Sequence, residues 1–351
     1  MVQIEHMTQE KTTITFKPKQ VTKRLLSVLG SRAQDVLVGR FGLAADKRMT
    51  LEAIGKKYKI TRERVRQIEN FSIINIRKSK EYAKEKVVFD EMKAIITTLG
   101  IVVSEEDLLS HFSKDKNTQN HVHFLLVVGE DFTKEKEDGE FKHRWHVDKE
   151  ISKKIDMSLR QLYSTLSDEE ILFESDMVAR FLEHVKDVND KYKNDEIAKR
   201  WLALSKLIDR NPLGEWGKAN SSNINAKGMR DYAFLVIRRH GSPIHFREVA
   251  KLITELFHKK AHVATTHNEL IKDSRFVLVG RGLYALKEWG YMAGVVKDVI
   301  AGVIEKNGPM TKEEIIKKVL KERYVKENTI MVNLQNPKLF KKMKDGKYAI
   351  A

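Results

Sequence analysis

Four polar side chains in residues 61–70 have the types and the spacing needed to hydrogen-bond to base edges. They are Arg62, Glu63, Arg66 and Gln67, at positions i, i+1, i+4 and i+5, which share one side of a helix. An Arg guanidinium can donate two bonds to guanine, Gln can pair with adenine in the same way, and Glu can accept from cytosine. Thr61 is suited to cap the first turn, so the segment predicts a helix whose N-terminal half reads bases in a DNA major groove. The residues predicted to contact DNA, including two basic residues at the helix end, are Thr61, Arg62, Glu63, Arg64, Arg66, Gln67, Arg77 and Lys78.

Two short amphipathic helices are predicted to hold this polar face outward. Each has one apolar side at helical spacing. The residues that form these sides are Leu51, Ile54 and Tyr58 in the first helix and Val65 and Ile68 in the second. Lys59 and Ile60 leave room for a short turn between the helices, so the pattern predicts a helix-turn-helix.

From Leu25 to Ser79, including RAQDVLVGRFGL at 32–43, the chain resembles region 4 of the sigma-70 family of bacterial transcription initiation factors. In that family the Arg-Phe-Gly-Leu segment ends the preceding helix, and the TRER-x-RQIE helix reads the −35 promoter element. Region 4 also docks on RNA polymerase. The resemblance covers about a sixth of the chain and implies double-stranded DNA and core RNA polymerase as partners. After Ile68 the usual Ala-rich continuation is missing, and the alternative is a divergent helix-turn-helix kept only for packing.

Full sigma factors carry an upstream helical region whose aromatic side chains melt the promoter. About 24 residues precede the region-4-like segment here. We therefore expect a chain that borrows the DNA-reading or polymerase-docking part of a sigma factor and does not melt DNA by itself.

Charge is distributed unevenly along the sequence. The net charge is +16, with +11 in residues 1–80, −7 in residues 81–226 and +12 in residues 227–351. Basic segments attract phosphates, whereas an acidic segment is repelled from a duplex. We expect both ends to favour nucleic acid and the middle to be scaffold or protein-facing, although Lys-rich surfaces also serve solubility.

The chain has no Cys, which excludes disulfides and thiolate metal sites. It also has no apolar run of membrane-spanning length and no apolar signal core at its N-terminus. These features predict a soluble, cytoplasmic and nucleoid-associated bacterial protein.

A weak internal repeat follows residue 85. Three segments starting at Gly100, Gly241 and Gly308 each pass through helices into an aromatic-containing hairpin with a Gly turn. The second helices are predicted at 119–127, 263–271 and 328–334, and the hairpins at 132–147, 276–286 and 340–350. Helices followed by a hairpin are the order of a winged helix.

Residues 227–291, with SPIHFREVAKLI and THNELIKDSRFVLVGRGLYALKEWGY, resemble the HARE-HTH winged helix. That domain is known from a bacterial RNA polymerase accessory subunit, restriction endonucleases and chromatin proteins. The alternative is a module that binds protein or only packs. The polar residues that the resemblance offers for DNA contact are His267, Asn268, Lys272, Arg275 and Arg281. In the third repeat Lys341, Lys342 and Lys344 form a basic wing that could lie on phosphates or remain a solvated edge.

The fold class predicted is mainly α and multi-domain, with tandem helix-turn-helix and winged-helix modules and small β-hairpin wings. The predicted boundaries are a flexible arm at 1–20, the helix-turn-helix at 21–82, an acidic winged helix at 86–147, a helical spacer at 148–210, a linker at 211–226, the HARE-like winged helix at 227–291 and a terminal winged helix at 292–351.

We expect no enzyme and no cofactor. The sequence has no phosphate-cradling Gly-rich loop before a helix and no nucleophile elbow. His121 and His123 lie near other histidines, but no carboxylate pattern of a known metal site accompanies them, and we expect no metal and no small-molecule substrate. The function predicted is a sequence-specific DNA-binding transcription factor that reads a −35-like element. The alternatives are an RNA polymerase accessory subunit that docks by protein contacts and the DNA-specificity component of a restriction or defence system.

Overall fold

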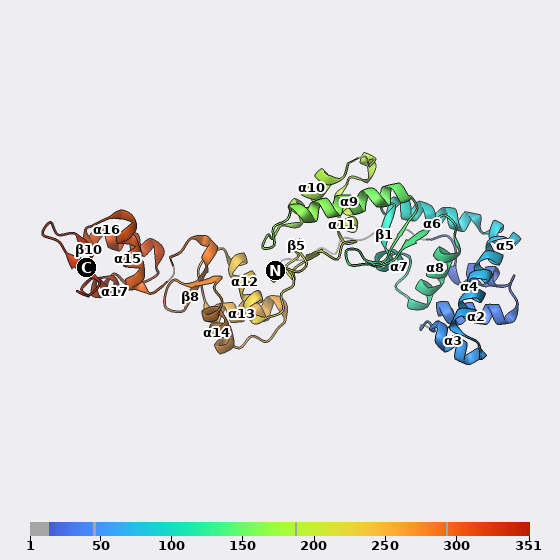
Figure 1. The fold of residues 1–351 in the computed structure, drawn as a ribbon, viewed down its shortest axis with the longest axis horizontal. Coiled ribbons are helices and arrows are strands. Elements are labelled where there is room, and N and C mark those ends of the chain that lie inside the picture. Colours follow the sequence, from blue (N-terminus) through green and yellow to red (C-terminus); the bar gives the residue numbers. More distant parts are fainter. Residues whose placement is uncertain (1–13, 45–46, 187, 293) are drawn as a thin grey trace. The chain divides into compact units, whose positions relative to one another are not determined.

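The structure, a computed structural model, describes residues 14–44, 47–186, 188–292 and 294–351. It is mainly helical, with small antiparallel sheets (Figure 1). The chain divides into two compact units, one ending at Asp209 and the other beginning at Arg210. Within the described residues, no helix combines the length and the apolar character that crossing a membrane requires.

Five helices at the start of the first unit carry the predicted helix-turn-helix. They are α1 (Pro18–Leu26), α2 (Ser31–Phe41), α3 (Leu51–Tyr58), α4 (Arg62–Arg77) and α5 (Lys80–Lys84). α2 ends at Gly42, whose φ of 66° is the left-handed conformation that glycine adopts without strain, where the Arg-Phe-Gly-Leu segment predicts an end. Val36, Ile54 and Val65 bring α2, α3 and α4 together in a small core of their own. The predicted helix-turn-helix is thus present as two packed helices.

The flexible arm expected at residues 1–20 is wrong over its described part. The amide of Thr15 donates to a side-chain oxygen of Glu91 at 2.7 Å, and Phe16 packs against the core. α1 already begins within this stretch, because Pro18 starts the helix and its apolar side is buried. Residues 1–13 of the predicted arm lie outside the described residues.

Three helix-and-hairpin repeats follow, in the order that the sequence pattern predicts. The first repeat contains α6 (Lys86–Thr98), β1 (Val102–Ser104), α7 (Glu105–Phe112), α8 (Lys116–Val128), β2 (Thr133–Glu135) and β3 (Arg144–His146). The second contains α12 (Met229–His240), β6 (Ile244–His245), α13 (Phe246–Phe257), α14 (Val263–Lys272), β7 (Phe276–Leu278) and β8 (Leu283–Leu286). The third contains α15 (Val296–Asn307), α16 (Lys312–Glu322), α17 (Glu327–Leu334), β9 (Phe340–Lys342) and β10 (Tyr348–Ile350). The three predicted hairpins are confirmed.

The three repeats resemble one another more clearly in the order of their strands than in their sequences. The first two sheets have the orders β1-β3-β2 and β6-β8-β7, so the short strand after the first helix pairs with the last strand of the hairpin. In the third repeat Met310 bridges to Tyr348 on β10, which gives the same order. The glycines that mark the repeats all have positive φ, at Gly100, Gly241 and Gly308, where the chain leaves a helix.

The stretches predicted as helical spacer and linker both pack against neighbouring elements. α9 (Lys149–Thr165), α10 (Glu174–His184), the 3₁₀ turn η1 (Asp190–Tyr192) and α11 (Asp195–Leu202) form the spacer. Trp201 of α11 donates to the carbonyl of Gly100 at 2.9 Å, which attaches the spacer to the first repeat. β4 (Ile208–Arg210) ends the predicted spacer, and β5 (Trp216–Lys218) lies in the predicted linker. Glu215 there binds Arg238 of α12 at 2.6 Å, so this stretch is part of the second unit's packing. After β8 a 3₁₀ turn, η2 (Lys287–Trp289), closes the second repeat.

Candidate nucleic-acid interface

Local capping fixes the start of each helix in the helix-turn-helix. Thr50 accepts a hydrogen bond from the amide of Ala53 at 3.1 Å, and Thr61 accepts one from the amide of Arg64 at 3.1 Å. Between the two helices Lys59 adopts a left-handed φ of 52°. These contacts satisfy first-turn amides that otherwise have no partner. The hydroxyl of Thr61, a residue predicted to contact DNA, therefore caps α4 and fixes where this helix begins.

A close approach of the backbone keeps the turn tight. A Cβ on Gly55 would lie 2.6 Å from the carbonyl oxygen of Ile60, nearer than side chains come to backbone oxygens. The amide of Ile60 in turn donates to the carbonyl of Gly55 at 3.0 Å. Glycine at this position therefore allows α3 and α4 to cross closely.

The predicted reading side chains lie together on the exposed side of α4. Arg62, Glu63, Arg66 and Gln67 are exposed, whereas Val65 on the opposite side is buried. This division of one helix into a buried and an exposed side leaves its N-terminal half free to enter a groove.

Two of these side chains are paired with each other in the free protein. Arg66 donates two hydrogen bonds to Glu63, at 2.9 and 2.7 Å. The hydrogen bond from Arg66 lowers the pKa of Glu63, and the same contact raises the pKa of Arg66. Arg64 donates to Gln67 at 3.0 Å, while Arg62 forms no hydrogen bond or ion pair with the described residues. Base contact by Arg66 and Gln67 thus requires an exchange of partners, and Arg62 is free from the start.

Contacts with α2 and with the first repeat hold α4 in place. Arg40 of α2 pairs with Glu69 of α4 at 3.2 Å. Arg77 at the end of α4 donates to the carbonyls of Val127 and Val128 at 3.0 and 2.9 Å. The guanidinium of Arg77, predicted as a DNA contact, is therefore used to join α4 to α8, whereas Lys78 remains exposed.

Helix α8, which occupies the reading position in a winged-helix order, is buried. Asn120, His121 and the following residues through Leu126 are at most 7% exposed. Asn120 donates to the carbonyl of Gly42 at 3.1 Å and accepts from Arg48 at 3.1 Å. The helix therefore packs on the helix-turn-helix and has no side available for a groove, in line with the acidic character of this repeat.

A charged cluster connects α8 with α7 and with strands β2 and β3 of the first repeat. Glu105 accepts hydrogen bonds from Lys134 and, at 2.9 Å, from the indole of Trp145, with His123 Nε2 at 3.5 Å. Burial raises the pKa of Glu105, but contacts with His123 and Lys134 outweigh burial and hold that pKa well below its ordinary value. Burial lowers the pKa of His123. These groups stabilise the repeat from inside and do not face outward.

The second repeat uses two of its predicted DNA contacts for its own packing. The His267 ring stacks on Phe246 with ring centres 4.1 Å apart and planes 17° from parallel. Arg275 pairs with Asp273 at 2.7 Å and with Asp231 at 3.0 Å. Both side chains thus have structural partners that a sequence pattern does not reveal. The exposed polar candidates of the second unit are Asn268, Lys272 and Arg281 and, on the third hairpin, Lys341, Lys342 and Lys344.

Sequence reasoning missed a basic hollow beside the turn. Its lining includes Arg32 at the start of α2 and Lys57 and Lys59 around Tyr58, whose hydroxyl donates to Asp35 at 3.1 Å. Lys59 belongs to the turn that precedes α4, and the other two cations line the same hollow. The Lys-Lys-Tyr-Lys run at 56–59 is a sequence signal for these cations, although the apolar spacing of α3 indicates only a packing role for Tyr58. Among the described residues, no three His, Asp or Glu side chains are grouped as metal ligands would be.

The family described as Sigma-70, region 4 matches residues 25–78. The RNA polymerase sigma factor SigA of Clostridium acetobutylicum is 38% identical over 72 residues, which is 20% of this chain and 19% of that protein. SigA of Lactococcus lactis subsp. cremoris is 45% identical over 53 residues, 15% of each chain. The RNA polymerase sigma-C factor of a Nostoc species is 34% identical over 80 residues, 23% of this chain and 19% of that protein.

The chain therefore spans about a fifth or less of the length of these relatives. The matches confirm the predicted resemblance to sigma-70 region 4 and support a sigma-like, DNA-binding role in transcription. The matched family ends at residue 78, so the HARE-HTH resemblance of residues 227–291 stays a prediction.

Proposed function

We propose that this chain is a sequence-specific DNA-binding transcription factor that reads a −35-like element through residues 61–70 and acts with RNA polymerase. One observation carries the proposal. Arg62, Arg66 and Gln67 stand exposed on the N-terminal half of a capped helix whose other side is fixed by packing. Rigid placement of groove-reading side chains is what base recognition needs. The proposal includes no catalytic step.

The three repeats are proposed to be winged helices with different tasks. The first is acidic and its α8 is buried, which supports a scaffold role. The second, HARE-like, and the third present exposed Lys272, Lys341 and Lys342, which can follow phosphates without reading sequence. Weak phosphate binding by the second unit would raise the effective concentration of α4 near DNA.

The test begins with selection of bound sequences from a random duplex pool by the full chain. Affinity for the selected site is then measured for the Arg62→Ala, Gln67→Ala double variant by fluorescence anisotropy. We expect a loss of roughly 10²-fold or more, because each base contact contributes about 1–3 kcal/mol. The matched control is Lys153→Ala with Gln161→Ala, which removes the same net charge and an exposed Gln from α9. Equal affinity of both double variants for the selected site would contradict the proposal.

A polymerase accessory subunit is the second candidate function, and exposed apolar side chains favour it. Phe71 is 65% and Ile74 46% exposed on the half of α4 beyond the reading residues. The apolar sides of α1 and α2 are covered by α8, so a partner of this segment would have to use another surface such as this one.

Affinity purification from nuclease-treated lysate of the host tests this candidate by asking whether core RNA polymerase accompanies the tagged chain. We expect Phe71→Ala with Ile74→Ala to lose polymerase while keeping site selection on DNA. If the Arg62, Gln67 double variant retains full function in the host, docking and not base reading is the role of α4.

A further inference from the structure

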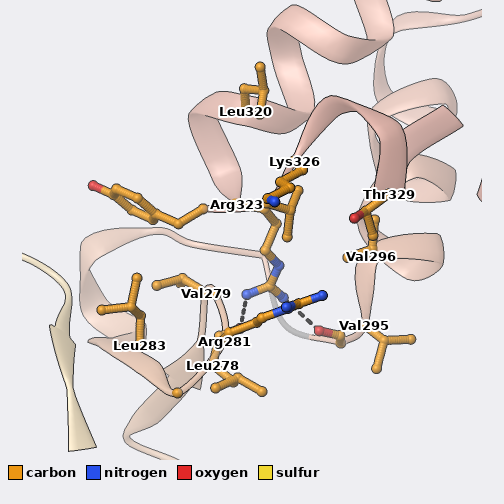
Figure 2. Close-up of a pocket in the computed structure, with 15 residues that line it drawn as sticks. Leu278, Val279, Arg281, Leu283, Val295, Val296, Leu320, Arg323, Lys326 and Thr329 are labelled. Atoms are coloured by element: carbon orange, nitrogen blue, oxygen red, sulfur yellow. Dashed lines mark hydrogen bonds between the residues drawn. The ribbon is translucent and has the colours of Figure 1, made fainter.

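A cavity of about 770 Å³ lies in the second unit between the hairpin of the second repeat and the helices of the third. Figure 2 shows Leu278, Val279 and Leu283 on one side of it and Leu320, Val295 and Val296 around the others. Much of this apolar surface remains in contact with solvent, since Leu278 is 47% and Val295 58% exposed. Cavities of roughly 300–1,000 Å³ with mostly apolar walls are typical of small-ligand sites.

The floor of the cavity is a buried cation with neutral partners. Arg323, 2% exposed, donates to the carbonyl of Leu278 and to those of Met292 and Gly294 at 2.7 and 2.6 Å. Burial lowers the pKa of Arg323 from its ordinary value, and the more distant charges of Glu322 and Asp298 oppose that effect. Carbonyl oxygens satisfy the donors of the guanidinium but do not neutralise its charge.

Two further cations reach the same cavity. Figure 2 shows the Arg281 side chain crossing the cavity beside Arg323 toward Val295, and Lys326 standing above it at the start of α17. Neither Arg281 nor Lys326 forms an ion pair with the described residues. None of the described residues that line the cavity is acidic. Three positive groups against an apolar wall with no carboxylate create a potential that favours an anion.

We propose that this cavity binds a small amphiphilic anion, whose apolar body lies against Leu278, Leu283 and Val295 and whose carboxylate, phosphate or sulfonate binds Arg281 and Lys326. Arg281 belongs to the second repeat and Lys326 to the third. A bound ligand contacts both and stabilises their junction, so its concentration sets how firmly the two repeats are held together. Arg281 is thereby assigned to this site and not to DNA.

The probe for the test is 8-anilinonaphthalene-1-sulfonate, which joins an aromatic body to one sulfonate and fluoresces when bound. Titrated into the full chain, it should saturate one site. The Arg281→Glu variant should raise the dissociation constant roughly tenfold or more, because a hydrogen bond to a charged group is replaced by repulsion. The matched control is Arg247→Glu, which makes the same charge change at an exposed position of α13 outside the cavity and should leave binding unchanged.

A second variant and two competitors show whether the Arg281→Glu variant loses binding because of its charge or because it fails to fold. Val295→Trp fills the cavity mouth at a half-exposed position and should abolish saturable binding. Decanoate should displace the probe, whereas decylamine, with a similar chain and the opposite charge, should not. The proposal is overturned if neither variant weakens binding, or if decylamine competes as well as decanoate. It is also overturned if an acidic Glu-Leu peptide displaces the probe where decanoate fails, because that result would indicate a protein partner.

Discussion

At the scale of single residues, the DNA-reading role proposed for α4 predicts that Glu63 affects how much of its affinity for DNA is specific. Its carboxylate holds Arg66 in the free protein and is a negative charge on a surface proposed to meet phosphates. A carboxylate there opposes every duplex alike but can accept a hydrogen bond from cytosine at the right site. We therefore expect Glu63 to lower the affinity for DNA in general and to raise the discrimination between sequences.

The Glu63→Gln variant tests this trade. We expect tighter binding to unrelated duplex DNA and a fall of about tenfold in the ratio of specific to unrelated affinity, because one base contact discriminates by roughly 1–3 kcal/mol. Anisotropy titrations against the selected site and a scrambled duplex measure the ratio. Glu52→Gln on α3, which breaks an exposed pair with Lys56, serves as the control and should keep the ratio. An unchanged ratio for Glu63→Gln would remove the carboxylate from base recognition.

At the scale of elements, the histidines of α8 make the first repeat sensitive to acid. Burial lowers the pKa of both His121 and His123, so each binds a proton less readily in the folded chain than in the unfolded chain. Stability from these groups is complete above the unfolded pKa near 6.5 and is lost as pH falls below it. The charged groups facing His123 are Arg48, Lys134 and Glu105.

Urea unfolding at pH 7.5 and pH 5.5 measures this sensitivity. We expect the free energy of unfolding of the wild type to be lower at pH 5.5 than at pH 7.5, because the unfolded histidines bind protons that the folded ones bind less readily. The double variant His121→Asn, His123→Gln should flatten the pH dependence even where it lowers stability overall. His240→Gln, an exposed histidine of α12, should keep the wild-type slope. A slope unchanged by the double variant would assign the acid sensitivity to other groups.

Elements with local signals were predictable, and elements defined by their neighbours were not. The caps at Thr50 and Thr61 and the Asp-Gly turn of the third hairpin each act within a few residues, so the sequence specifies them directly. The burial of α8 depends on where α1 and α2 lie, and its Asn and His residues gave no sign of a core helix. The prediction that Arg77 and Arg275 contact DNA is limited in the same way, since their carbonyl and carboxylate partners are distant in the chain.

At the scale of the whole molecule, each compact unit contains more than one predicted module. In the first, the helix-turn-helix shares its core with the first repeat, from Val21 and Phe41 to Phe124 and Trp145. In the second, the junction of the second and third repeats passes through Arg323, and the amide of Tyr324 donates to the carbonyl of Val279 at 2.7 Å. Modules that looked separable in the sequence are therefore joined by buried contacts.

The hydrogen bonds of Arg323 predict that the junction in the second unit depends on this residue. Replacing it with Met keeps much of the side chain's bulk but leaves the carbonyls of Leu278, Met292 and Gly294 without their donor. Each buried acceptor that loses its partner costs about 1–3 kcal/mol, less where water enters. We expect the second unit to unfold in one transition in the wild type and in two in the Arg323→Met variant, and protease cleavage between the repeats to be faster in the variant.

Arg281→Met is the matched control for this prediction, since it removes a guanidinium from the same cavity that makes no hydrogen bond to the described residues. It should leave both the transition and the cleavage rate as in the wild type. Chemical denaturation followed by intrinsic fluorescence and limited proteolysis with mapped cleavage sites distinguish the two variants. If Arg323→Met and Arg281→Met behave alike, the apolar contacts and the Tyr324 bond hold the repeats together, and the buried guanidinium contributes charge to the cavity without fixing the junction.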